Sequence, residues 1–224
     1  IDPNRIGLPA GTTLQDVFPD MQVDLSLRIR RAKTLAEKRQ QDLLREVDEF
    51  CTGYEQRIRE MGGIGFFLGG IGPDGHIAFN VRGSDRFSTT RLLDPNYETK
   101  AAAASDLGGL EAARYNSVIT IGLATITYNP DAVALIFAAG EAKAKIVAGT
   151  LHSPMCNEYP GSMLAQLPHA RFYLTAGAAK SLTSRVYVDL QRRPEVREDE
   201  LHRIVMDISL ATGKPIRALR NEVA

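Results

Sequence analysis

Apolar residues recur every three to four positions from about residue 35 to residue 61, with charged residues between them. This spacing is typical of an amphipathic helix, so we expect one long helix there or two consecutive ones. Gly62 and Gly63 end the pattern. Residues 64–68 then form an uninterrupted apolar run that is too short for a helix, and they predict a buried strand.

The same alternation of short apolar runs and helical patterns continues along the chain. Further strands are predicted over 118–123, 133–139 and 171–175, and helices over 141–148 and 178–185. Buried strands that alternate with helices indicate an α/β fold with a mainly parallel, Rossmann-like sheet and helices on both faces. In such sheets, ligands bind at the carboxyl ends of the strands.

The C-terminal region has a helical pattern of its own over residues 196–210. We expect a main domain over residues 1–190 and a helical extension over residues 191–224 that packs on it.

Charge and composition argue against some classes of binding partner. The chain has 224 residues, and its 27 basic residues balance 27 acidic ones, so nucleic acid and anionic membranes are poor partners. No apolar run approaches the roughly 20 residues that cross a bilayer, and we expect a cytoplasmic protein. Cys51 and Cys156 have no metal-binding spacing and are expected to be core thiols. No cluster of metal ligands is visible in the sequence, and we expect neither a metal nor a cofactor.

Two glycine-containing loops could carry chemistry. One follows a predicted strand over residues 5–8 and leads into a helix near Gln15, a geometry that directs backbone amides at an anion. The other spans residues 69–75 and leads from the predicted strand at 64–68 to Asp74 and His76. A carboxylate beside an imidazole can act as an acid/base pair. The alternative is a structural turn in which Asp74 caps a helix and His76 packs.

Residues 68–80, Leu-Gly-Gly-Ile-Gly-Pro-Asp-Gly-His-Ile-Ala-Phe-Asn, resemble the signature of glucosamine-6-phosphate deaminases and, more loosely, that of 6-phosphogluconolactonases. Four other segments resemble motifs of the deaminase family in the same order: 7–13, 120–126, 140–144 and 160–166. The resemblance covers roughly residues 5–17 and 40–185. Together the motifs are specific, although each alone would be weak.

The resemblance implies an α/β enzyme that acts on a sugar phosphate. His76 would assist opening of the sugar ring, and Asp74 would work with it in proton transfer. The residues that would contact the substrate are Gly11, Thr12, Thr13, Gly69, Gly70, Arg91 and Lys143. Of these, the 11–13 loop and Lys143 would hold the phosphate. The structural alternatives are a helix cap for Thr12 and Thr13, a solvated helix lysine for Lys143 and a surface ion pair for Arg91.

The chain departs from the family pattern at two places. Where the family has a glutamate that polarises the histidine, this chain has Val81, and the nearest substitute in sequence is Asp85. The segment that would supply the aspartate for proton abstraction at C2 is missing near residues 18–21. Either the printed sequence omits residues, as the absent initiator methionine also suggests, or the protein has lost them. We favour omission, because a sheet without an internal strand–helix unit would expose apolar surface.

The function expected from the resemblance is isomerisation of a phosphorylated amino sugar with deamination, which yields a ketose phosphate and ammonia. Loss of a carboxylate that orients a histidine would lower this activity strongly. One alternative is a lactone hydrolase in which Asp74 and His76 activate water, and another is a sugar-phosphate sensor without turnover. The expected partner is a small sugar phosphate, and the sequence leaves open whether the chain forms a homo-oligomer.

Overall fold

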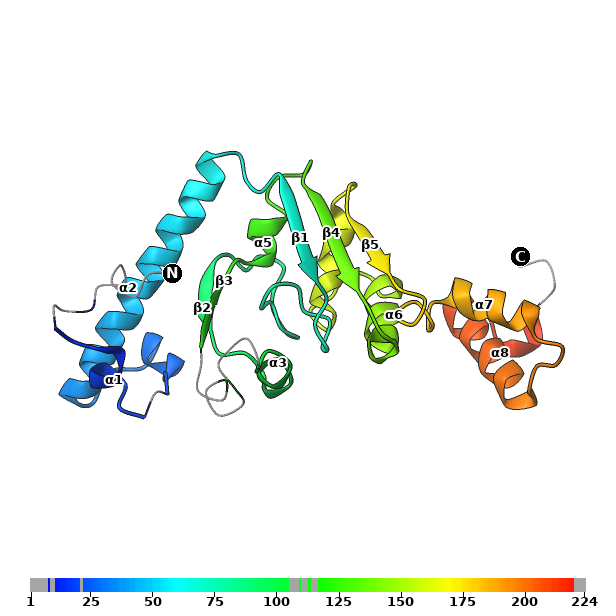
Figure 1. The fold of residues 1–224 in the computed structure, drawn as a ribbon, viewed down its shortest axis with the longest axis horizontal. Coiled ribbons are helices and arrows are strands. Elements are labelled where there is room, and N and C mark those ends of the chain that lie inside the picture. Colours follow the sequence, from blue (N-terminus) through cyan, green and yellow to red (C-terminus); the bar gives the residue numbers. More distant parts are fainter. Residues whose placement is uncertain are drawn as a thin grey trace. The chain divides into compact units, whose positions relative to one another are not determined.

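The structure is a computed structural model that describes residues 8, 11–20, 22–104, 109, 113 and 117–219 (Figure 1). The chain divides into two compact units, Ile1–Ser181 and Leu182–Ala224. The boundary expected at residue 190 falls inside a helix, α7 (Thr183–Arg192). Packing of the C-terminal extension on the main domain remains a prediction, and most of the strand expected over 5–8 lies outside the described residues.

The described elements of the first unit alternate between helices and strands. In chain order they are α1 (Leu14–Val17), η2 (Leu25–Arg28), α2 (Leu35–Glu60), β1 (Phe66–Gly70), β2 (Arg91–Leu93), α3 (Tyr97–Ala102), β3 (Val118–Thr120), α5 (Leu123–Ile126), β4 (Val133–Ala138), η3 (Glu141–Lys143), α6 (Ala144–His152), η4 (Pro160–Gln166) and β5 (Arg171–Leu174), where η marks a 3-10 helix. The second unit contains α7, α8 (Glu198–Thr212) and η5 (Ile216–Ala218).

The long amphipathic pattern forms one continuous helix, α2. Its N-cap is Thr34, whose hydroxyl accepts a hydrogen bond from the Glu37 amide at 3.1 Å. The buried face carries the apolar residues that the periodicity selects, including Leu44, Val47 and Cys51. Burial also raises the pKa of the Cys51 thiol. Cys156 is only half-buried, so the core-thiol prediction is confirmed for Cys51 alone.

Strands β1, β4 and β5 form a parallel sheet in the order β1-β4-β5 (Figure 1). The register places Leu68 beside Leu135 and Leu135 beside Arg171. Ala134, Ile136 and Ala138 of β4 point to one face and are buried there. The predicted α/β class and its parallel sheet are therefore confirmed.

The opposite face of the sheet is more open. Phe66, Leu68, Phe137 and Tyr173 lie on this face, and each of their side chains is more than half exposed. Strand β1 is therefore not the fully buried strand that its apolar run predicts. Successive side chains of a strand point to opposite faces, so an apolar run is buried throughout only where both faces are packed.

Strand β3 is a correction to the predicted sheet. It is shorter than the run over 118–123 and pairs antiparallel with β2 in a separate two-stranded sheet. The Phe79 amide donates to Oγ1 of Thr120 at 3.1 Å, and the Asn80 side chain donates to the Ile121 carbonyl at 2.9 Å. These bonds tie the end of β3 to the turn after His76 instead of to the parallel strands.

The later helices begin or end at different residues from those predicted. The pattern over 141–148 forms η3 and then α6, which continues to His152. The helix expected over 178–185 starts at Thr183, because hydrogen-bonded turns occupy residues 175–180. Helix α8 ends at Thr212 and is capped by Gly213, which has a left-handed backbone. In the part of the chain that the structure describes, each helix is too short or too polar to cross a membrane.

Candidate functional site

The glycine-rich segment after β1 forms a tight turn that returns the chain to its own start. The Gly72 amide donates to the His76 carbonyl at 2.9 Å, and the Gly75 amide donates to the Gly72 carbonyl at 3.1 Å. Gly75 has a φ of +83°, which only glycine adopts readily. A Cβ at Gly72 would lie 1.9 Å from Cε1 of His76, so the imidazole occupies the space that a side chain would need.

Asp74 and His76 form a hydrogen-bonded pair inside this turn. Oδ1 of Asp74 lies 2.5 Å from Nδ1 of His76 and also accepts the His76 amide at 3.3 Å. A carboxylate accepts and does not donate, so in the neutral imidazole Nδ1 carries the proton and Nε2 has the lone pair. The side chain of His76 keeps 14% of its surface exposed, whereas Asp74 is almost fully buried.

The second carboxylate oxygen of Asp74 is also satisfied. Oδ2 accepts the Arg82 amide at 3.0 Å and Nδ2 of Asn96 at 2.8 Å. Burial acts to raise the pKa of Asp74, but the hydrogen bonds from His76, Arg82 and Asn96 outweigh it and hold this pKa well below its usual range. Asp74 is therefore ionised at neutral pH. In this state its carboxylate can accept a hydrogen bond from Nδ1 of His76.

Helix α3 reaches this pair through two residues that the motif analysis missed. Asn96 is the N-cap of α3, and its side chain accepts the Thr99 amide at 2.9 Å. Oγ1 of Thr99 lies 3.3 Å from Nδ1 of His76. The sequence signal for these residues is the N-cap pattern of an asparagine followed by a short helix, which does not by itself indicate proximity to His76.

Lys143 lies in the same region, at the end of η3. Its ammonium donates to the Ile71 carbonyl at 2.8 Å, which connects the segment after β4 to the turn after β1. Burial lowers the pKa of Lys143, while the negative charge of Asp74 acts to raise it. The structure thus brings Asp74, His76 and Lys143 together beyond the carboxyl ends of two adjacent parallel strands, where ligands bind in α/β sheets.

The hydrogen bonds observed in the 11–13 loop are those of a helix cap. The Thr13 hydroxyl accepts the Asp16 amide at 3.3 Å and caps α1. Gln40 of α2 donates to the Val17 carbonyl at 2.9 Å, which attaches α1 to α2. Within the described residues, the hydrogen bonds do not link Gly11, Thr12 or Thr13 to His76 or to Lys143. The helix cap is observed at Thr13, and a phosphate role for this loop remains a prediction.

The remaining predicted site residues lie before and after the turn in the chain. Gly69 and Gly70 come before it, and Arg91 comes after it. The two glycines are the last residues of β1 and lead directly to it. Among the described residues, the guanidinium of Arg91 donates to three neutral oxygens: Asn80 Oδ1 at 2.9 Å, the Thr89 carbonyl at 3.2 Å and Ser84 Oγ at 3.2 Å. Within the described part of the chain, Arg91 therefore does not form the surface ion pair that was its alternative, and burial lowers its pKa.

Val81 is half-buried and lines a hollow of about 380 Å³ that Ser84, Asp85 and Arg91 also line. Oδ1 of Asp85 accepts the Phe87 amide at 2.7 Å and so caps its own turn. The carboxylate that contacts His76 is that of Asp74. The imidazole therefore has an acidic partner although residue 81 is a valine.

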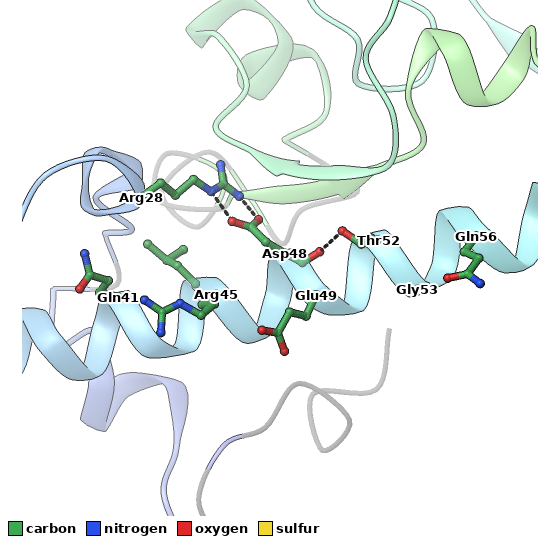
Figure 2. A pocket seen from close by; sticks show the side chains of 9 residues that line it. Arg28, Gln41, Arg45, Asp48, Glu49, Thr52, Gly53 and Gln56 are labelled. Carbon is green, nitrogen blue, oxygen red and sulfur yellow. Dashed lines mark hydrogen bonds and ion pairs between the residues drawn. The ribbon is translucent and has the colours of Figure 1, made fainter.

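A larger hollow of about 500 Å³ lies along α2, away from the predicted site residues (Figure 2). It is lined by Arg28, Gln41, Leu44, Arg45, Asp48, Glu49, Thr52, Gly53 and Gln56. Figure 2 shows Arg28 and Asp48 paired through two contacts, Nε to Oδ2 at 2.8 Å and Nη2 to Oδ1 at 2.5 Å. This ion pair offsets the charges of Arg28 and Asp48, and the described residues that line the hollow include no histidine.

The side chains that bind metal ions in proteins are mainly those of histidine, cysteine, aspartate and glutamate. The described residues contain no group of three or more of these side chains placed to hold a metal ion. The side chains that the site offers for acid/base chemistry and anion binding are those of Asp74, His76 and Lys143.

Comparison with known proteins finds relatives that are described as glucosamine-6-phosphate isomerases or deaminases. A glucosamine-6-phosphate isomerase of Candida albicans is 35% identical over 148 residues, which are 64% of this chain and 58% of the relative. A glucosamine-6-phosphate deaminase of Rhodopirellula baltica is 38% identical over 132 residues, 59% of this chain and 51% of the relative. The chain thus spans about half the length of the relatives it matches. No family model matches the chain.

A solved structure has a similar fold. It is a monomeric glucosamine-6-phosphate deaminase, with a TM-score of 0.55 and 27% sequence identity. The similarity covers 60% of this chain and 54% of that one.

Proposed function

Because the chain belongs to the glucosamine-6-phosphate deaminase/isomerase family, we propose that its Asp74–His76 pair acts on a phosphorylated amino sugar. The observation that carries this proposal is the 2.5 Å contact between Asp74 and Nδ1 of His76. It leaves Nε2 as a base beside the carboxyl ends of β1 and β4. A cytoplasmic location and a sugar-phosphate partner are parts of the same proposal.

The first chemical step is opening of the sugar ring. Nε2 of His76 takes the proton of the anomeric hydroxyl and returns it to the ring oxygen as the C1–O5 bond breaks, which leaves an open-chain aldehyde. The positive charge that forms on the imidazole is stabilised by ionised Asp74. The same pair can assist transfer of a proton from C2 to C1. With one water as co-reactant, loss of the 2-amino group then gives a ketose phosphate and ammonia.

The phosphate would be held by Lys143 with the amides and hydroxyls of the 11–13 loop. The Lys143 ammonium donates to a neutral carbonyl, that of Ile71 at 2.8 Å, and this hydrogen bond does not offset its positive charge. Charge-assisted hydrogen bonds to a phosphate dianion are stronger than the bond to this carbonyl. Replacement of Lys143 by glutamine should therefore raise KM for the sugar phosphate more than it lowers kcat.

Lactone hydrolysis is the second candidate function, and Val81 is the observation that favours it. Hydrolysis of a phosphorylated sugar lactone needs a base that activates water. Asp74 and His76 can supply it without a second carboxylate at residue 81. Lactone hydrolysis also needs no aspartate for proton abstraction at C2.

Activity assays on the purified chain separate these functions. Glucosamine 6-phosphate should give ammonia and fructose 6-phosphate, and His76→Asn should abolish both products, whereas His169→Asn, at an exposed histidine, should leave them unchanged. Acid release from 6-phosphogluconolactone without ammonia would establish the hydrolase instead. Binding of a hexose phosphate in calorimetry without any turnover would indicate a sensor. Absence of both binding and turnover would refute all three functions.

A further inference from the structure

The carboxylate of Asp74 has a different set of donors on each oxygen. Oδ1 faces the imidazole and the amide of His76, and Oδ2 faces the Arg82 amide and the Asn96 side chain. Rotation of a carboxylate about its terminal bond is otherwise soft. Because Oδ2 is held by its own two donors, Oδ1 is kept in line with Nδ1 of His76.

The two donors to Oδ2 come from different parts of the chain. Arg82 contributes a backbone amide from the loop that follows the turn. Asn96 contributes a side chain from the start of α3, and its Nδ2 is the nearer donor at 2.8 Å against 3.0 Å. Asn96 is therefore the side chain through which a separate element acts on Asp74.

The orientation of the Asn96 amide is determined by its second role. Its Oδ1 accepts the Thr99 amide at 2.9 Å as the cap of α3, so its NH₂ group must point towards Asp74. The opposite orientation would place an amide oxygen against a carboxylate and lose the cap. The same first turn of α3 brings Oγ1 of Thr99, a fully buried residue, to 3.3 Å from Nδ1 of His76.

We infer that Asn96 is a positioning residue for the Asp74–His76 pair: its amide holds the Asp74 carboxylate so that Nδ1 of His76 keeps its proton and Nε2 faces the substrate. This role does not require contact between Asn96 and substrate. The inference deepens the proposed function, and the effect that we expect on turnover rests on that function. Its structural part, the state of the imidazole, can be measured without any turnover.

Two substitutions separate the positioning role from the capping role. Asn96→Ser keeps an oxygen that can cap α3 but removes the donor to Asp74. Asn96→Asp also keeps the cap and places a second carboxylate against Oδ2. Asn129→Ser is the matched control, because the Asn129 side chain likewise accepts a backbone amide, that of Asp131 at 3.0 Å, in a turn elsewhere.

The primary measurement is ¹⁵N NMR of the imidazole of His76, one of four histidines in the chain. The unmodified chain and Asn129→Ser should show the Nδ1-protonated tautomer, and Asn96→Ser a mixture of both tautomers. For glucosamine 6-phosphate, Asn96→Ser should lower kcat about 10- to 100-fold with little change in KM, and Asn96→Asp should lower it at least as much.

An unchanged His76 spectrum in both Asn96 variants would overturn the inference, as would the same change in Asn129→Ser. If Asn96→Ser does not fold, the spectrum of Asn96→Asp decides. A lack of turnover by the unmodified chain would refute the proposed deaminase activity, while the NMR comparison would still decide whether Asn96 positions the pair.

Discussion

Oδ1 of Asp74 lies 2.5 Å from Nδ1 of His76, although only Gly75 separates the two residues in the chain. The histidine thus receives its carboxylate from within its own turn. The turn can do this because Gly75 has a positive φ and Gly72 leaves room for the imidazole. Pairing of His76 does not depend on residue 81, where the resemblance predicts a glutamate.

Asp74→Asn should lower both activity and the pH dependence of stability. Turnover should fall roughly 10²- to 10⁴-fold, as for other histidines that lose their orienting carboxylate. The pKa of Asp74 is depressed in the folded chain. Its contribution to the free energy of unfolding is therefore present above the unfolded pKa of about 3.9 and is lost as pH falls towards the folded pKa.

Denaturant unfolding at several pH values, with turnover at neutral pH, checks this prediction. Asp131→Asn, at an exposed aspartate, is the control and should behave like the unmodified chain. Equal acid sensitivity of the Asp74→Asn variant and the unmodified chain would contradict the low pKa of Asp74.

Gly72→Ala should displace the imidazole of His76. The added Cβ would lie 1.9 Å from Cε1 and 2.2 Å from Nδ1 of that ring. We expect a loss of about 1–3 kcal/mol in the free energy of unfolding, as for other overpacked sites, together with loss of turnover. Gly53→Ala is the matched control. Gly53 lies inside α2 with open space at its Cβ position, so the change should stabilise the chain by about 0.5–1 kcal/mol. Thermal melts that show equal effects for both variants would argue against the clash.

Val81→Glu tests whether the acid expected at residue 81 is needed. Because Nδ1 of His76 already faces Asp74, we expect turnover to change by less than about threefold in kcat/KM. Val81→Thr, which has a similar volume and no charge, is the comparison variant. A rise of about tenfold or more in the glutamate variant alone would mean that Asp74 is an insufficient partner for the histidine.

Glu55→Gln should weaken the attachment of α2 to α5 and to Thr90, the residue before β2. Oε2 of Glu55 accepts the Thr90 hydroxyl at 2.9 Å and the Thr125 hydroxyl at 2.6 Å, and Oε1 accepts Nε of Arg59 at 3.0 Å. The amide would leave some of these donors unpaired, at a cost of about 1–3 kcal/mol. Glu60→Gln, at an exposed glutamate of the same helix, should cost less than about 0.5 kcal/mol. Chemical denaturation that gives the same midpoint for both variants would refute a structural role for Glu55.

Much of the local structure followed from the sequence, because its causes are local. The three- to four-residue period predicted α2, and short apolar runs predicted the three parallel strands and hence the α/β class. Asp74 and His76 could be singled out as an acid/base pair because they stand two positions apart in a glycine-rich turn. Their resemblance to a family motif supplied the roles that spacing alone does not determine.

The tertiary structure decided the features that depend on distant residues. Asn96 and Thr99 approach the pair only because the chain returns to it through α3, and Lys143 does so because β4 lies beside β1. The pairing of β3 with β2 and the exposure of Phe66 and Leu68 also depend on what packs against each strand. A one-dimensional pattern records which residues are apolar or charged, but contacts between remote residues arise only when folding closes the intervening loops.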